Sequence, residues 1–190
     1  MSFEIIDKKL NGLILLQPRI FEDNRGSFFE AFRKDLLTEV GVDENFVQDN
    51  QSTSQKNVIR GLHFQWNRPL GKLISVVRGE ALFVELDIRK NSPTFGQHST
   101  FLLDDKNHNL LWVPFGFANG FCSKEDNTVV NYKCTAYWNP KCEAGILWND
   151  KELNIDWQLN NEDKLIISEK DKLNYTFEEW QGREESRRVL

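Results

Sequence analysis

The segment N-V-I-R-G-L-H-F-Q-W, residues 57–66, combines two side chains that could do chemistry with the pattern of a buried strand. Its branched and aromatic residues favour a half-buried β-strand, and Gly61 within it indicates a β-bulge. A bulge adds one residue, so Arg60 and His63 would project to the same side despite their odd spacing. The plainer alternative, a solvated arginine and a structural histidine, is the commoner outcome for an isolated R-G-x-H.

Acid–base chemistry without a metal is the reaction class that these residues suit. Imidazole works well as a base near neutral pH, which makes His63 the candidate base. Tyr132 is a candidate acid because a phenol can donate a proton, and Lys72 is a candidate positive charge for stabilising an enolate oxygen. Position in the sequence does not by itself select these three, since surface lysines and packed tyrosines are common.

Other catalytic classes find little support. A cupin-type metal site needs H-x-H on one strand and a further histidine after P-x-G, but His63 lacks such a partner and P-F-G-F-A-N has Asn119 there. No G-x-S-x-G, G-x-G-x-x-G or P-loop occurs, which argues against a serine nucleophile and against a dinucleotide or triphosphate cradle. We therefore predict a site with no metal and with no dinucleotide or nucleoside-triphosphate cradle.

Composition places the chain among globular proteins. Its 190 residues, 39% hydrophobic and 28% charged, fit a single domain over residues 1–190. A net charge of −5 without a basic block argues against nucleic acid and membrane surfaces as partners. The N-terminus has no apolar run of signal-peptide length, and the three cysteines form no C-x-x-C. A cytoplasmic protein without disulfides is the expectation.

Short apolar runs separated by turns, roughly every 8–12 residues, predict an all-β sandwich or barrel whose interior is a natural ligand cavity. Residues 72–89 predict a β-hairpin, with K-L-I-S-V-V and A-L-F-V-E-L-D-I-R around R-G-E. Alternation in its second arm places Phe83 and Glu85 on one face and aliphatic residues on the other. Residues 34–41 predict a helix, and the charged tail, about 173–190, is expected to be peripheral.

A set of motifs, in order along about residues 3–172, resembles the dTDP-4-dehydrorhamnose 3,5-epimerase family. The motifs are F-E-D-N-R-G-S-F-F-E, F-V-Q-D-N-Q-S, V-I-R-G-L-H-F-Q, G-K-L, D-I-R-K-N-S-P-T-F-G, V-P-F-G-F-A-N-G-F, Y-K-C-T-A-Y, G-I-L-W-N-D and S-E-K-D. The resemblance implies a cupin-type double-stranded β-helix, or jelly-roll barrel, with a few short helices, usually a homodimer and without a cofactor. It also implies an isomerase that inverts carbon 3, carbon 5 or both of a dTDP-4-keto-6-deoxyhexose through an enolate.

The matching positions imply a role for each residue. His63 would be the base, and Asp171, in S-E-K-D, would hold its imidazole in the right tautomer. Lys72 would stabilise the enolate, and Tyr132 would act as the acid. The residues that match nucleotide- and diphosphate-binding positions, some of them across the dimer, are Arg25, Glu30, Gln48, Asn50 and Arg60.

The sequence departs from the family pattern at four positions expected near the sugar. Phe83 replaces an aspartate, Asn119 a histidine, Leu70 a glutamine and Trp138 a tyrosine. Because an Asp–His pair lost together leaves no orphan charge, we interpret Phe83 and Asn119 as linked changes that meet in the barrel. A more apolar wall there predicts a different sugar, or inversion at one carbon.

Three alternatives stand beside the double epimerase. A single-centre 3-epimerase of a related 4-keto-6-deoxy sugar nucleotide is the nearest. A non-catalytic barrel that binds a nucleotide sugar is the second, and the presence of four acid–base residues argues against it. A keto-isomerase is the third, disfavoured because additional histidines would be expected around its sugar.

Overall fold

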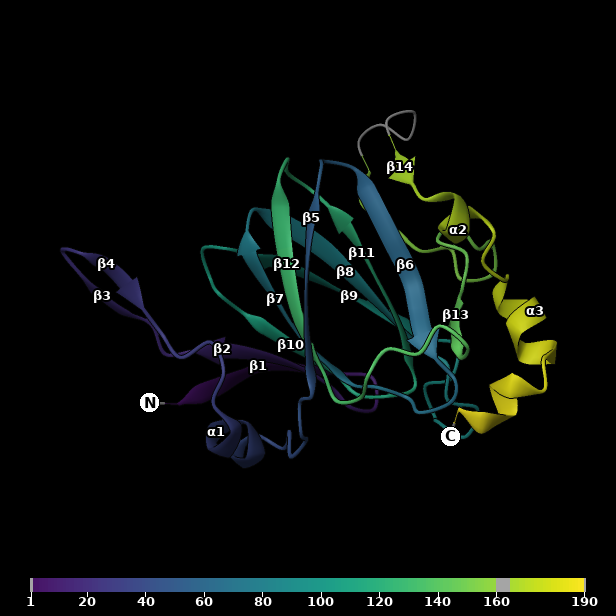
Figure 1. The fold of residues 1–190 in the computed structure, drawn as a ribbon, viewed down its shortest axis with the longest axis horizontal. Helices are drawn as coiled ribbons and strands as arrows, with labels where there is room; N and C mark the ends of the chain where they lie inside the picture. The colour runs from purple at the N-terminus through teal and green to yellow at the C-terminus, as the bar shows by residue number, and fades with distance from the viewer. Residues whose placement is uncertain (1, 160–164, 190) are drawn as a thin grey trace.

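The protein is described by a computed structural model over residues 2–159 and 165–189, and most of its strands form two sheets that pack face to face (Figure 1). The first sheet has the order β1-β2-β10-β7-β12-β5 and the second the order β13-β6-β11-β8-β9, with β14 beside β6. The strands of the first sheet are β1 (Phe3–Lys9), β2 (Leu13–Pro18), β10 (Leu110–Val113), β7 (Lys72–Arg78), β12 (Thr128–Cys134) and β5 (Gln48–Ser54). Those of the second are β13 (Glu143–Gly145), β6 (Val58–Gln65), β11 (Phe117–Ser123), β8 (Glu80–Asp87), β9 (His98–Asp104) and β14 (Ile166–Ile167). This is the all-β jelly-roll architecture that the sequence predicts.

A separate hairpin and four short helical segments complete the part of the chain that the structure describes. Strands β3 (Phe21–Asp23) and β4 (Gly26–Phe28) form a hairpin that projects away from the barrel (Figure 1). The predicted early helix is α1 (Lys34–Glu39), followed much later by α2 (Glu169–Lys172), α3 (Phe177–Gly182) and the 3-10 helix η2 (Glu185–Arg188). In the ranges described, no helix is long and apolar enough to cross a membrane.

Three apolar clusters hold these layers together. The interior cluster draws Phe83 from the second sheet and Val130 from the first, so it fills the space between the sheets. A second cluster, which includes Val84, covers the outer face of the second sheet, and a third joins Leu37 of α1 to the first sheet. The alternation of β8 therefore sends Phe83 inward and Val84 outward, as predicted.

The hairpin predicted over residues 72–89 is wrong. Strand β7 pairs with β10 and β12, whereas β8 pairs with β9 and β11. Gly79, with φ +77°, carries the chain from one sheet to the other, and a Cβ there would lie 2.8 Å from the Thr128 hydroxyl. Because Ile74 and Phe83 belong to the same interior cluster, the two strands pack across the core instead of edge to edge.

The C-terminal segment is more deeply buried than the sequence predicts. Helix α3 begins with a capping box, in which the Thr176 hydroxyl accepts the Glu179 N–H and the Glu179 carboxylate accepts the Thr176 N–H. Phe177 and Trp180, only 3% and 1% exposed, belong to the cluster on the outer face of the second sheet. The segment after residue 173 therefore covers this sheet instead of lying at the periphery.

Candidate active site

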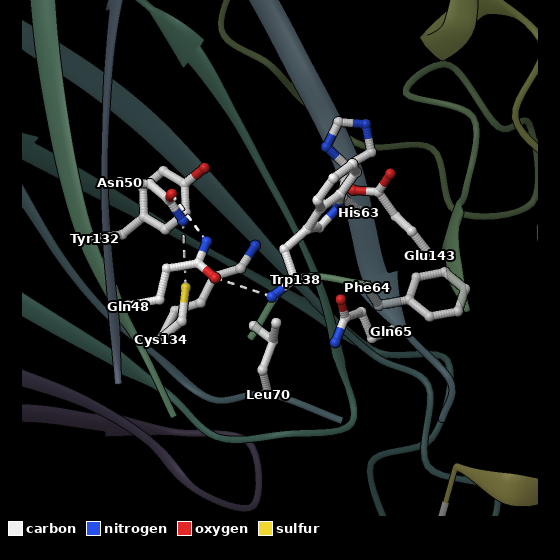
Figure 2. A pocket seen from close by; sticks show the side chains of 11 residues that line it. Gln48, Asn50, His63, Phe64, Gln65, Leu70, Tyr132, Cys134, Trp138 and Glu143 are labelled. Atoms are coloured by element: carbon white, nitrogen blue, oxygen red, sulfur yellow. Dashed lines mark hydrogen bonds between the residues drawn. The ribbon is translucent and has the colours of Figure 1, made fainter. Parts of the chain in front are cut away.

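A cleft between the two sheets brings the predicted acid–base residues together. It consists of two adjoining hollows of about 310 Å³ and 450 Å³, and His63, Lys72 and Tyr132 line both. Figure 2 shows the first of them. The first hollow is lined by Gln48, Asn50, His63, Phe64, Gln65, Leu70, Lys72, Tyr132, Cys134, Trp138 and Glu143.

A β-bulge in β6 directs His63 and Arg60 into the same hollow. Asn119 of β11 pairs with His63 and Phe121 pairs with Arg60, so two residues of β6 oppose a single residue between them. Gly61 makes this possible, because its φ is +117° and a Cβ would lie 2.6 Å from the backbone of the facing strand. Both His63 and Arg60 line the second hollow, which confirms the predicted bulge.

His63 is held by Asp171 at a distance of 2.6 Å between Nε2 and Oδ1. Strand β14 runs parallel to β6 and leads into α2, whose N-cap Ser168 accepts the Asp171 N–H. Burial alone would raise the pKa of Asp171, but the hydrogen bond and charge interaction with His63, together with hydrogen bonds from Gly61 and Ser168, lower that pKa. Because the ionised carboxylate can only accept, Nε2 must donate to it, and in the neutral imidazole Nδ1 is then the nitrogen with the lone pair.

Tyr132 stands on the opposite wall of the cleft from His63 (Figure 2). Tyr132 belongs to β12 in the first sheet, whereas His63 belongs to β6 in the second. Burial, helped by Cys134 and Glu143, raises the pKa of Tyr132 and keeps the phenol protonated. Nζ of Lys72 lies 5.5 Å from the centre of the phenol ring. The predicted base and the predicted acid thus face each other, with the Lys72 side chain beside the predicted acid.

Lys72 is also tied to the opposite sheet through an amide. Its Nζ donates to Asn119 Oδ1 at 2.8 Å, and Asn119 Nδ2 donates to Glu85 Oε1 at 2.6 Å. Burial lowers the pKa of Lys72, and the Glu85 carboxylate acts against this. Burial raises the pKa of Glu85 well above its usual range, while the Lys72 charge acts in the opposite direction.

The predicted meeting of Phe83 and Asn119 is wrong. Asn119 is paired with Glu85 across β8 and β11, and Phe83 is paired with Phe121. Phe83 faces the barrel interior, as expected, but it is 1% exposed and packs 5.4 Å from the Phe121 ring. Its large apolar side chain is drawn into the interior cluster, beneath the cleft surface, so direct contact with a sugar is not available to it.

The predicted nucleotide-binding residues divide into two groups. Gln48 and Asn50 line the first hollow, where the Gln48 amide donates to Asn50 at 3.0 Å and accepts the Trp138 backbone N–H at 2.9 Å. Leu70 and Trp138 line the same hollow, and Trp138 is 53% exposed. These side chains come from β5 and from loops at one end of the barrel, and they surround the entrance to the acid–base groups.

Arg25 and Glu30 lie apart from this cleft. Arg25 is at the tip of the β3–β4 hairpin, where its side chain is 86% exposed and pairs with Asp23 at 2.6 Å. Glu30 lines a small hollow beside β1 and α1, and its carboxylate pairs with Arg33 at 3.4 Å. Within one chain, therefore, neither residue joins the other predicted binding residues.

Two site residues were not foreseen from the sequence. Glu85 is a fully buried carboxylate that accepts a hydrogen bond from Asn119. Its position in the sequence, a glutamate beside Phe83 on the face predicted to point inward, could have indicated this role. Glu143 lines the first hollow and pairs with Lys170 from α2. Burial would raise the pKa of Glu143, but its interactions with Lys170 lower it. The sequence contains no spacing that links Glu143 to Lys170, since the two meet only in the fold.

Metal removal is expected to leave activity unchanged. Across the described ranges, no group of three or more histidine, cysteine, aspartate or glutamate side chains is arranged to hold a metal ion. Dialysis against EDTA should leave the turnover rate within about twofold of the untreated protein, since His63 needs no metal to act as a base. Stoichiometric zinc or iron in elemental analysis, with activity lost on chelation and restored by that metal, would contradict this prediction.

The fold and the cleft together define a class of protein. A jelly-roll barrel of the cupin type, with a carboxylate-held imidazole and a protonated phenol on opposite walls, is built for proton transfer to and from a bound small molecule. The family model described as dTDP-4-dehydrorhamnose 3,5-epimerase matches residues 7–179. The chain belongs to this family of isomerases, as the resemblance in the sequence predicted.

Individual relatives agree with this assignment. A dTDP-4-dehydrorhamnose 3,5-epimerase of Methanothermobacter thermautotrophicus is 45% identical over 171 residues, 90% of this chain and 92% of that protein. A Bacillus anthracis enzyme of the same name, solved with TDP and pyrophosphate, is 42% identical with a TM-score of 0.89 over 92% of this chain and 99% of that one. A Legionella pneumophila 3,5-epimerase bound to dTDP-4-keto-L-rhamnose is 41% identical with a TM-score of 0.88, over 92% and 93% of the two chains.

Proposed function

We propose that this protein inverts carbon 3 and carbon 5 of a dTDP-linked 4-keto-6-deoxyhexose by removing a proton on one face and returning one on the other. The placement of His63 and Tyr132 on opposite walls of one cleft carries this proposal. A protein that merely bound the sugar nucleotide would need neither the His63–Asp171 hydrogen bond nor a buried, protonated phenol. The Legionella relative bound to dTDP-4-keto-L-rhamnose supports the choice of sugar.

The proton balance assigns one step to each group. Nδ1 of His63 takes the proton beside the 4-keto group, and Asp171 stabilises the resulting imidazolium. The electron pair moves to the keto oxygen, and the Lys72 ammonium stabilises that enolate. The Tyr132 hydroxyl then gives a proton to the opposite face of the same carbon. Exchange with water restores the phenol and the neutral imidazole.

The rest of the cleft suits the nucleotide. We assign the thymidine diphosphate to the first hollow and its entrance, where the amides of Gln48 and Asn50 and the exposed ring of Trp138 lie. Arg60, in the adjoining hollow, supplies a cation for the diphosphate. An indole face can stack on a base, and amides can bind its polar edge.

Product analysis tests the proposed function. The purified protein is incubated with dTDP-4-keto-6-deoxy-D-glucose, and the ring configuration of the product is read from proton coupling constants by NMR. Inversion at both carbons, giving dTDP-4-keto-L-rhamnose, is the expected result. An unchanged sugar, with the nucleotide bound, would contradict the proposal and favour a non-catalytic binder.

A second candidate, inversion at carbon 3 alone, is favoured by one observation. The Asn119 amide is engaged on both sides, with its oxygen on Lys72 and its nitrogen on Glu85. Glu85 takes one of its two N–H donors and Lys72 occupies its oxygen, so fewer of its polar groups remain for a sugar hydroxyl. In the same experiment, a product inverted only at carbon 3 would select this alternative.

We also propose that the protein acts as a homodimer in which each β3–β4 hairpin reaches the partner's cleft. The hairpin projects from the barrel (Figure 1) and carries the exposed rings of Phe21 and Phe28, which are 38% and 60% exposed. Arg25 lies at its tip, apart from the cleft of its own chain. The family resemblance implies a nucleotide contact for Arg25, and a dimer in which each hairpin reaches the partner's cleft would provide that contact.

Mixed dimers are expected to regain activity lost by each variant alone. Arg25→Ala and His63→Asn are co-expressed with different tags, and dimers carrying both tags are purified. If Arg25 serves the partner's site, one of the two sites in each mixed dimer is intact, so the rate should return to about half that of the wild type. Light scattering establishes the dimer. A mixed dimer as inactive as its parents, or a monomer with full activity, would contradict this prediction.

A cytoplasmic location is the last part of the proposal. Cys122, Cys134 and Cys142 are free thiols buried in the fold. Free thiols of this kind are usual in a reducing compartment. Cell fractionation with markers for each compartment tests it.

A further inference from the structure

We propose that Glu85 is a positioning residue for Lys72, which it holds through Asn119 and maintains as a charged ammonium in the cleft. The inference rests on the proposed function, since it gives Lys72 its role at the enolate oxygen. Glu85 itself lies below the cleft surface and touches Asn119 instead of the substrate.

Asn119 is held in one orientation by Lys72 on one side and Glu85 on the other. Its amide oxygen accepts from Lys72 Nζ at 2.8 Å, and its amide nitrogen donates to Glu85 Oε1 at 2.6 Å. The reverse orientation would place the amide NH₂ against the ammonium and the amide oxygen against the carboxylate. Two repulsive contacts would then replace two hydrogen bonds, so Glu85 fixes which end of Asn119 faces Lys72.

Within the described ranges, Glu85 is buried with one carboxylate oxygen unpaired. Its side chain is 0% exposed, and among the described residues its Oε2 has no hydrogen-bond partner. A buried carboxylate with an unpaired oxygen is costly, and an apolar side chain in its place would remove that cost. A folding role does not account for such a group. Burial opposes the charged form of Glu85, but the Lys72 charge and the Asn119 hydrogen bond favour it, so the carboxylate is joined through Asn119 to the cation that stabilises it.

The charged and titratable groups around Lys72 show why Glu85 matters. Burial lowers the pKa of Lys72, and Glu85 gives the largest opposing contribution, ahead of Cys134 and Glu143. Removing the Glu85 charge therefore lowers the pKa of Lys72 further, so Lys72 loses its proton at a lower pH. The titratable groups that line the hollows with Lys72 are His63 from β6, Tyr132 and Cys134 from β12, and Glu143 from β13, with Arg60, Lys170 and Asp171 in the second hollow.

The test measures Lys72 without substrate. Lysine labelled with ¹³C and ¹⁵N is incorporated, the Lys72 signal is assigned with Lys72→Arg, and its titration is followed by NMR in the wild type and in Glu85→Gln. The amide keeps the shape and the hydrogen bond from Asn119 while removing the charge. We expect the Lys72 midpoint to fall by about one pH unit or more, as an opposite charge a few ångströms away typically moves a pKa. Glu80→Gln, at the far end of β8, should leave it unchanged.

Kinetics supply the second readout. In Glu85→Gln the alkaline limb of the rate profile should move to lower pH by the same amount, and kcat should fall more than KM changes, because the enolate forms only during turnover. An unchanged Lys72 midpoint together with an unchanged profile would overturn the inference.

If Glu85→Gln does not fold, a titration of the wild-type protein still tests whether Glu85 acts on Lys72. The Glu85 carboxyl carbon should report an inflection at the Lys72 midpoint, because the two groups titrate as a pair. Separate, unlinked inflections would overturn the inference. Wild-type protein with linked titrations but no turnover would instead overturn the proposed function.

Discussion

Replacing His63 by asparagine is expected to abolish proton exchange into the sugar while the fold and nucleotide binding persist. His63 supplies the basic Nδ1 of the described cleft, because Nε2 is committed to Asp171 at 2.6 Å. Loss of a general base typically lowers a rate by about 10²–10⁴-fold. The measurement is deuterium uptake from D₂O by NMR, with calorimetry of TDP binding to show that the cleft is intact.

A histidine outside the cleft provides the control for this variant. His98 lies on β9, at the edge of the second sheet, and His98→Asn should exchange at the wild-type rate. Exchange by folded His63→Asn at more than about a tenth of the wild-type rate would remove His63 from its role as the base.

Replacing Tyr132 by phenylalanine is expected to separate exchange from inversion. His63 would still remove a proton and return one to the same face, so deuterium should enter the sugar without change of configuration. Delivery to the opposite face would lack its donor, and the rate of inversion should fall by about 10²–10⁴-fold. The two rates are read from one NMR experiment in D₂O, as label content and as ring coupling constants.

The exposed Tyr137 allows a matched control. Its side chain is 70% exposed, so Tyr137→Phe removes a hydroxyl from the same part of the chain without affecting the cleft. If Tyr132→Phe inverts the sugar at the wild-type rate, the acid is another group. The positions of His63 and Tyr132 on opposite walls would then no longer support the proposed mechanism.

The parts of this fold that could be predicted are those coded by local pattern. Alternation in β8 correctly placed Phe83 inside and Val84 outside, since a strand repeats every two residues. Gly61 correctly indicated the bulge that brings Arg60 and His63 into one hollow. Such features depend on a few adjacent residues, and short windows of sequence contain them.

Features that depend on distant residues could not be predicted in this way. The turn at Gly79 looks the same in sequence whether the strands pair or enter different sheets, and only the shared interior cluster decides between them. The partner of Asn119 depends on the register of β8 against β11, which places Glu85 there instead of Phe83. Asp171 lies 108 residues from His63 and was found only through the family resemblance.

For a different reason, the position of Arg25 relative to the cleft could not be predicted. The residues of its hairpin match the family motif, yet the structure of one chain leaves Arg25 exposed at the tip. The proposed dimer would account for this exposure, and neither a single sequence nor a single subunit places a second copy of the chain. The mixed-dimer experiment addresses this point directly.

One measurement tests the central claim most directly, namely that the cleft moves protons on a dTDP-4-keto-6-deoxy sugar. Wild-type protein is incubated with dTDP-4-keto-6-deoxy-D-glucose in D₂O, and the sugar is analysed by NMR for deuterium at each carbon. We predict label at carbon 3 and carbon 5, each with inverted configuration. Label at carbon 3 alone would select the single-centre enzyme, and a sugar without deuterium at either carbon would contradict the account.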